Sequence, residues 1–298
     1  MLSIALVLLP DFLLIFLGLG LRTHGGYPPV FWQHIERLVY YVMFPALLFR
    51  AVSHTPLAFA PAFNMLLVGV GFTLAGLLFG LAANWLFRLT PLTFASSIQT
   101  AFRFNTYVGL AVIDRLAGQA GVATFAMLLG VIVPLVNGLA VWFLARQGDA
   151  SLWRELLRNP MILSTLSGFA FNLTGLPMPE VIDHVVGLLA AAALPLGLIS
   201  VGAGLRAQGL RASLPLVNYF TAVKLVAVPA VAWGLSAWLG VTGLYFQAAL
   251  VLAALPTASS AYILAMRMGG DGKTVATIIT MNIFVAMLTL PMWLGWGR

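Results

Sequence analysis

The chain has 298 residues, of which 61% are hydrophobic and only 8% are charged, whereas a soluble domain carries about 25% charged residues. This composition excludes an ordinary soluble domain and indicates an all-α integral membrane protein. The net charge of +7 does not indicate a nucleic-acid partner, because the basic residues are distributed among loops in a pattern typical of membrane proteins. The absence of cysteine excludes disulfides and thiol chemistry.

A membrane-spanning helix needs about 20 mostly apolar residues, and breaks in the sequence divide this chain into about ten such segments. We expect the spans at residues 2–21, 35–53, 61–87, 92–117, 122–145, 159–176, 181–205, 214–239, 242–266 and 274–296. The chain then divides into a first five-helix half at residues 1–145, a short cytoplasmic connection at 146–158 and a second five-helix half at 159–298.

The basic residues indicate the orientation of these spans. If successive spans cross the membrane in opposite directions, most basic residues lie on the same side of the membrane as the first loop. These are Arg22, Arg37, Arg88, Arg146, Arg154, Arg158, Arg206, Arg211, Arg267 and Lys273. The other side keeps only Arg50, Arg115 and Arg298. By the positive-inside rule the first loop is cytoplasmic, so we expect both termini outside the plasma membrane. Because five is an odd number, the second half would be inverted relative to the first.

Matches between the two halves predict an inverted repeat. At an offset of 150 residues, Pro10, Gly18 and Pro45 recur as Pro160, Gly168 and Pro195. At an offset of 153 residues, Val122-Ala123-Thr124 recurs as Val275-Ala276-Thr277, and Trp85 recurs as Trp238. Secondary transporters are commonly built from inverted repeats and bind substrate near the bilayer midplane, where broken helices of the two halves meet.

The fourth segment contains the run FRFNTYVGLA, which places Arg103 and Asn105 inside the membrane. A cation at the midplane costs about 2.5 to 3.5 kcal/mol, so Arg103 must face a partner or a water-filled cavity. A guanidinium binds a carboxylate through two hydrogen bonds, and Asn105 and Thr106 add polar groups beside it. The alternative is that Arg103 braces the carbonyl groups of an interrupted helix.

The offset of 153 residues places Pro256 opposite Arg103, in the run ALPTASSAYILA of the ninth segment. A proline removes a backbone donor, so we expect a helix break at which Thr257 and Ser259 bind freed backbone groups or a ligand. Ser200 follows Pro195 and Gly197 in the seventh segment and is a further candidate for substrate contact. The alternatives are a proline kink and close packing of small residues.

Two further charged residues lie deep in the expected spans, Asp11 in the first and Lys224 in the eighth. We expect them to form a structural pair, or a pair that breaks during transport so that Asp11 carries a proton. Two cations against one acid make the midplane electropositive and favour an anionic substrate. Interhelical hydrogen bonds are the expected use of the intramembrane asparagines Asn64, Asn84, Asn137, Asn172, Asn218 and Asn282.

Six motifs carry a resemblance to a known family: FPALLFRAV, FRFNTYVGLAV, RNPMILSTLSGFAFNLTG, ALPLGLISVGAGL, KLVAVPAVAW and ALPTASSAYILAMRMGGD. In this order and spacing, the chain resembles the auxin efflux carrier family over nearly its whole length. The resemblance implies ten helices in two inverted five-helix repeats, a scaffold half and a mobile transport half. It also implies broken, crossing fourth and ninth helices, with Asn105 and Pro256 at the crossover.

The family moves organic anions, which are auxin in plants and small carboxylates such as malate or malonate in bacteria. This chain departs from many members because no proline follows Gly109, and its connection at 146–158 is shorter than the long polar loop of many plant members. The missing proline bears on the shape of the fourth-helix crossover, and the short connection favours a short bacterial-type secondary transporter or facilitator of the inner membrane that works by alternating access. The driving force is the membrane potential, protons or sodium. The alternatives are a sodium-coupled organic-anion symporter of the bile-acid type and a non-transporting membrane sensor.

An enzyme is not expected. The sequence contains no GxxxxGK[ST], HExxH or GxSxG motif, and its four histidines fall in or near expected loops. We therefore expect no catalytic residue, no cofactor and no metal. The expected partners are the small organic anion, a proton or sodium ion and membrane lipid, with a second copy of the chain as a candidate through a glycine-rich face.

Overall fold

The computed structural model describes residues 2–54, 59–144, 159–205 and 214–296, and the regular structure in these ranges is entirely helical. The expected connection at 146–158 lies outside the described residues. The first half contains α1 (Leu2–His24), α2 (Pro29–Leu38), the π-helix η1 (Val39–Met43), α3 (Phe44–His54), α4 (Phe59–Phe87), α5 (Pro91–Ser97), the 3-10 helix η2 (Ile98–Ala101) and α6 (Thr106–Leu144).

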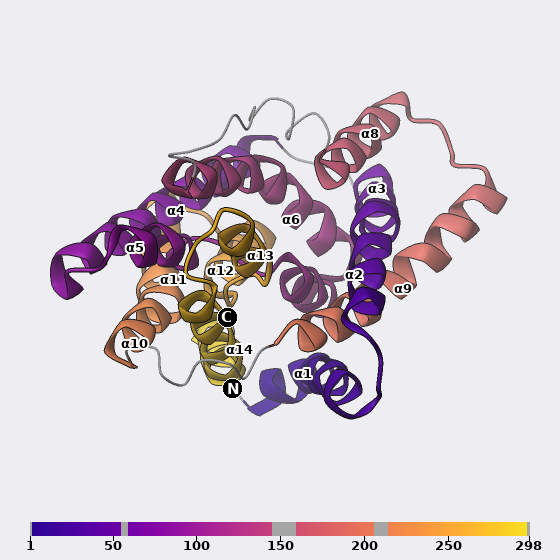
Figure 1. Ribbon diagram of the computed structural model, residues 1–298. Coiled ribbons are helices and arrows are strands. Elements are labelled where there is room, and N and C mark those ends of the chain that lie inside the picture. Colours follow the sequence, from indigo (N-terminus) through magenta and orange to yellow (C-terminus); the bar gives the residue numbers. More distant parts are fainter. Residues whose placement is uncertain (1, 55–58, 145–158, 206–213, 297–298) are drawn as a thin grey trace.

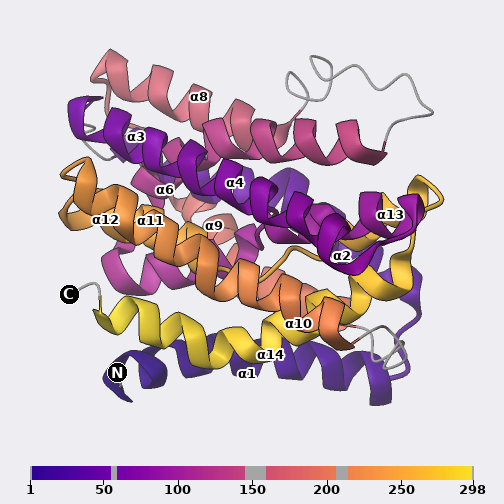
Figure 2. The same ribbon diagram turned by 90° about the vertical axis from the view of Figure 1, so that its left-hand side faces the viewer.

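The second half contains α8 (Pro160–Thr174), α9 (Glu180–Gly204), α10 (Leu214–Ala222), the π-helix η3 (Val223–Ala227), α11 (Val228–Trp238), α12 (Gly243–Ala254), α13 (Ser260–Arg267) and α14 (Gly272–Trp296). Across the described residues, five helical runs are long and apolar enough to cross a membrane. The α-helical fold class expected from the sequence is confirmed for the described ranges. Figure 2 shows that α1 begins and α14 ends at the same end of the molecule.

The expected fourth and fifth segments meet at a sharp turn inside α6. Gly118 has φ of 56° and ψ of −149°, which lies outside the helical region and reverses the direction of the chain there. Glycine adopts a positive φ without the steric cost that a Cβ brings. The structure thus places the turn at Gly118, within the gap expected between residues 117 and 122.

The helices fall into two groups (Figure 1). We name the first the α9 group: α1, α2 and α3 pack on α9, and α8 packs on the α3 helix of this group. We name the second the crossing group: α4 packs on α11 and α12, while α10, α12 and α13 pack on α14. Figure 1 shows α3, α8 and α9 on the right and α4, α5, α10 and α11 on the left. Helix α6, which we count in the crossing group, also contacts α1, α3, α8 and α9 along the boundary.

Glycines allow the helices of the α9 group to touch backbone to backbone. A Cβ at Gly18 of α1 would overlap the carbonyl of Ile199 in α9, and a Cβ at Gly202 of α9 would overlap the carbonyl of Ile15. The close approach expected from the glycine-rich sequence is confirmed here, within one chain. Because Gly202 is used in this internal contact, it gives no support to a dimer.

Helix α12 lies at the centre of the crossing group (Figure 1). Every residue from Ala248 to Leu255 is buried, with at most 1% of its surface exposed. A helix that is apolar on all sides is one that is surrounded by protein or lipid. In this protein the surrounding helices are α4, α6, α11 and α14.

Candidate functional site

The first element of the site is an interruption between η2 and α6. Helix η2 ends at Ala101 and α6 begins at Thr106. The side-chain Oδ1 of Asn105 accepts hydrogen bonds from the N–H groups of Tyr107 (3.1 Å) and Val108 (3.3 Å). Asn105 therefore caps α6 and satisfies donors that have no partner within the helix. The break needs no proline after Gly109, so this departure from the family pattern does not abolish the interruption.

The second element is an interruption between α12 and α13. Helix α12 ends at Ala254, and α13 begins at Ser260. Pro256 lies in the segment between them, where it has no N–H to donate to a helix. Its carbonyl accepts a hydrogen bond of 2.9 Å from the backbone N–H of Asn105. The expected break at each position is confirmed, and the two interruptions contact each other directly.

Further hydrogen bonds join the two interruptions. The Thr257 hydroxyl donates to the carbonyl of Thr100 (2.7 Å) and accepts from Nδ2 of Asn282 (2.8 Å). Gln99 donates from Nε2 to the carbonyl of Ala261 (3.2 Å). The side chains of Gln99, Thr257 and Asn282 are fully buried, so these bonds form away from water and hold the crossing together.

Arg103 lies in the first interruption and is only 9% exposed. Its Nη1 donates to Oε1 of Gln99 (3.1 Å), and its Nη2 donates to Oδ1 of Asn137 in α6 (2.9 Å). Both partners are neutral amide side chains, and they orient the guanidinium. Gln99 is not among the site residues predicted from the sequence. Its position four residues before Arg103, one helical turn away, is the signal that would have found it.

Two candidate serines carry hydroxyls that are buried without a partner. Within the described residues, neither Oγ of Ser200 nor Oγ of Ser259 has a hydrogen-bond partner. Leaving a buried polar group unsatisfied costs about 1 to 3 kcal/mol. Ser259 lies against Gly204, because a Cβ on Gly204 would be 3.3 Å from the Ser259 Oγ. Ser200 and Gly204 are both on α9, whereas Ser259 directly precedes α13 of the crossing group. The two serines therefore lie on opposite sides of the boundary between the two helix groups.

The expected pair between Asp11 and Lys224 is wrong. Oδ1 of Asp11 accepts from Nε of Arg115 at 2.7 Å, and Nζ of Lys224 donates to the carbonyl of Ala253 at 2.7 Å. The depth of each residue in its span did not reveal which helices are neighbours: α1 packs on α6, α9 and α14, whereas η3 packs on α4, α12 and α14. Lys224 therefore belongs to the crossing, and Asp11 joins the α9 group to α6.

Another ion pair lies within the α9 group. Arg50 of α3 makes two hydrogen bonds to Asp183 of α9, from Nε to Oδ1 (2.9 Å) and from Nη2 to Oδ2 (3.1 Å). Both side chains are about 30% exposed. A partly exposed pair within one helix group is structural and does not contribute to the site.

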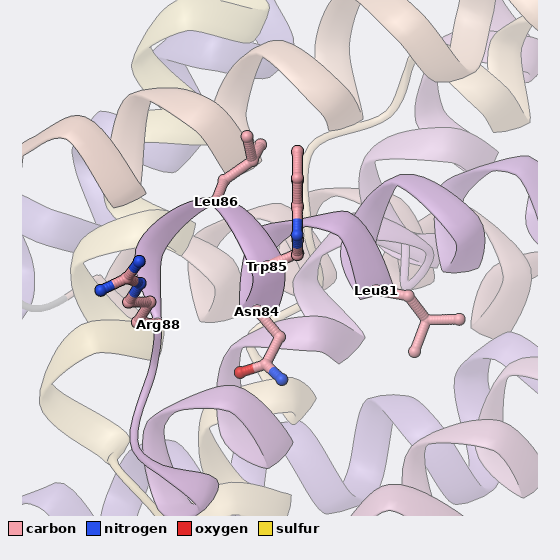
Figure 3. A pocket seen from close by; sticks show the side chains of 5 residues that line it. All are labelled: Leu81, Asn84, Trp85, Leu86 and Arg88. Carbon is pink, nitrogen blue, oxygen red and sulfur yellow. The ribbon is translucent and has the colours of Figure 1, made fainter.

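A surface pocket lies away from the crossing (Figure 3). It is lined by Leu81, Asn84, Trp85, Leu86 and Arg88, which come from the last turns of α4 and the residue after it. Trp85 is 84% exposed, as expected for a tryptophan at a membrane interface. Since none of these side chains belongs to the two interruptions, the pocket is a separate surface feature. No group of three or more His, Asp or Glu residues that could hold a metal occurs in the described ranges.

Comparisons with known proteins agree with a transport role. Residues 144–294 match the model of a family described as "Membrane transport protein". The chain is 26% identical to an uncharacterized transporter of Methanothermobacter thermautotrophicus, with 94% of each chain covered. It is 24% identical to a putative malonate transporter of Rhizobium meliloti, covering 95% of this chain and 93% of that protein.

A plant relative matches over a shorter length. A probable auxin efflux carrier component 1b of Oryza sativa subsp. japonica is 29% identical over 46% of this chain and 26% of its own length. The full-length matches are thus with short microbial proteins. The family model covers half of the chain, and the apolar helices suit repeated membrane crossings. The protein is a multi-pass membrane protein that belongs to the membrane transport protein family, the family of the auxin efflux carriers.

Proposed function

We propose that this protein is a secondary transporter or facilitator that carries a small organic anion, a carboxylate such as malonate or malate, across the bacterial plasma membrane. The observation that carries the proposal is the buried Arg103 guanidinium, held by two neutral amides beside two interrupted helices. The printed name of the Rhizobium meliloti relative, a putative malonate transporter, supports a carboxylate as the substrate.

The backbone at the crossing adds to the preference for an anion. Helices α6 and α13 both begin at the interruptions, at Thr106 and Ser260. A helix N-terminus carries a partial positive charge, and interrupted helices of transporters use such ends to bind anionic groups. In our proposal Arg103 binds one carboxylate, Asn105 and Thr106 lie beside it, and Ser259 and Ser200 donate from the two sides of the boundary.

We further propose ten spans arranged as two inverted repeats, which the packing of the α9 group supports. Gly18 lies against the carbonyl of Ile199. At the repeat offset of 150 residues, Gly18 corresponds to Gly168 and Ile199 corresponds to Phe49, and Gly168 lies against the carbonyl of Phe49 in the same way. The same offset relates two hydrogen bonds, because Arg22 corresponds to Asn172 and Ala203 corresponds to Ser53. Arg22 Nη1 donates to the carbonyl of Ala203, and Asn172 Nδ2 donates to the carbonyl of Ser53. Reciprocal contacts of this kind are what two inverted copies of one unit produce.

Alternating access then requires one helix group to move against the other. We assign the α9 group as the scaffold and the crossing group as the mobile part. The ion pair of Asp11 with Arg115 crosses the boundary between them, and the rings of Phe44 in α3 and Tyr107 in α6 stack across it with centroids 4.7 Å apart. These contacts stabilise the position seen in this structure and would have to change in the other one.

Uptake of radiolabelled malonate into proteoliposomes tests the proposed function. We expect saturable uptake that unlabelled malate reduces and that malonamide, the uncharged diamide of the same size, does not reduce. Empty liposomes give the background rate. Absence of uptake above this background, or equal competition by malonamide, would contradict the transport of a carboxylate.

A further inference from the structure

Lys224 is a buried lysine with no acidic partner in the described part of the chain. Its side chain is 1% exposed, and the ion pairs of the described residues do not include it. Helices α4, α12 and η2, which pack on η3, contain no charged residue, and α14 contributes only the exposed Lys273 in its first turn. A buried charge of this kind requires compensation by dipoles.

The compensation comes from the interrupted end of α12. The Nζ of Lys224 donates to the carbonyl of Ala253 at 2.7 Å, one residue before the helix ends. The C-terminal end of a helix carries a partial negative charge because its last carbonyls have no N–H partner within the helix. Pro256 increases this effect, because it has no N–H to offer to the carbonyl of Leu252 four residues earlier.

The backbone around Lys224 is also unusual. Residues Val223–Ala227 form the π-helix η3, and Lys224 is its second residue. Short π-helices inside α-helices occur often at functional sites. Here the π-helix lies in the helix run between α10 and α11, on the side that packs on α12 and α14. The sequence thus places a single positive charge against the broken end of a neighbouring helix.

Carbonyls freed by an interrupted helix are the groups that coordinate the coupling sodium ion in secondary transporters. We propose that the Lys224 ammonium is a resident cation that occupies this place, so that anion transport by this protein needs no sodium. The claim that transport needs no sodium rests on the proposed function. The binding of a cation at the C-terminal end of α12 can be tested without any substrate. Among the driving forces that the sequence left open, the proposal favours the membrane potential or protons over sodium.

Thermal unfolding of the purified protein in sodium chloride and in choline chloride tests the cation site alone. We expect the wild-type melting temperature to be the same in both salts, because the site is already filled. Lys224→Ala should melt lower in choline and recover part of the loss in sodium. Lys273→Ala, which removes the other lysine of the chain from an exposed position, should behave as the wild type does.

Malonate-evoked currents in proteoliposomes test the consequence for transport. The wild type should give equal currents in sodium and in choline, and Lys224→Ala should lose at least tenfold in choline. Wild-type currents or melting temperatures that depend on sodium would overturn the proposal, as would a Lys224→Ala variant that equals Lys273→Ala in choline in both measurements. A wild type that responds to malonate in neither salt would defeat the proposed function instead, and the melting curves would still decide the role of Lys224.

Discussion

The backbone N–H of Asn105 donates to the carbonyl of Pro256 over 2.9 Å, so the interruption of one helix is bonded to the interruption of another. The same asparagine caps α6 with its side chain. Asn105 therefore caps α6 through its side chain and joins the two broken helices through its backbone. A substitution other than proline removes the cap and keeps the backbone N–H, so it tests the side chain alone.

Two variants of Asn105 separate capping from charge. Asn105→Ala removes the cap and should cost about 1 kcal/mol of stability. Asn105→Asp keeps an oxygen that can cap the helix, but it introduces an acidic group beside Arg103. We expect it to melt near the wild-type temperature and to require about tenfold more malonate for half-maximal current, a difference of about 1.4 kcal/mol. Malonate currents of wild-type affinity in Asn105→Asp would show that the anion does not bind beside this residue.

Two glycines of α1 test the close approach of α1 to α9. A Cβ at Gly18 would overlap the Ile199 carbonyl, whereas a Cβ at Gly20 has no atom within 4 Å. Gly18→Ala should therefore destabilise the protein by about 1 to 3 kcal/mol, since overpacking forces the backbone apart. Gly20→Ala, on the same helix, should be neutral or slightly stabilising. Thermal unfolding in detergent measures both, and equal melting temperatures for the two variants would contradict the packing described here.

The ion pair across the boundary is tested by a double-mutant cycle. Asp11→Asn and Arg115→Gln each remove one charge of the 2.7 Å ion pair, so their effects on the free energy of unfolding should couple by about 0.5 to 3 kcal/mol. Asp11→Asn combined with Lys224→Met is the control and should be additive within about 0.5 kcal/mol. Coupling of Asp11 with Lys224, and none with Arg115, would restore the pairing that the structure rejects.

The proposed orientation of the membrane spans is testable because the chain contains no cysteine. A cysteine introduced at Leu176, which is 65% exposed between α8 and α9, should react with a membrane-impermeant maleimide on intact cells. A cysteine at Lys273, at the start of α14, should react only after the membrane is opened. The reverse pattern would place the termini in the cytoplasm and invert the proposed topology.

The sequence predicted the features that depend on local chemistry. Pro256 removes a donor, and Arg103 and Asn105 are polar in an apolar run, so the breaks could be located before the structure was known. The gap expected between residues 117 and 122 contains the kink that the structure places at Gly118. The matches at an offset of 150 residues included Gly18 and Gly168, which prove to be sites of close backbone contact.

Features that depend on which helix faces meet could not be predicted. Asp11 and Lys224 lie at similar depths, but their helices are not neighbours, so each finds a different partner. The partner of Lys224 is a backbone carbonyl, which has no signature in a sequence. Gln99 was missed because an isolated amide in an apolar segment does not reveal that it orients an arginine one turn away.

Charge movement on a solid-supported membrane during pulses of malonate tests the central claim, that Arg103 binds the transported anion. The comparison uses the wild type, Arg103→Gln and Arg37→Gln, which removes an exposed arginine of α2. Malonamide pulses give the response to an uncharged compound of the same size. The account predicts malonate currents in the wild type and in Arg37→Gln that are lost in Arg103→Gln. Malonate currents of unchanged size and affinity in Arg103→Gln would contradict it and would leave Arg103 as a structural residue of the crossing.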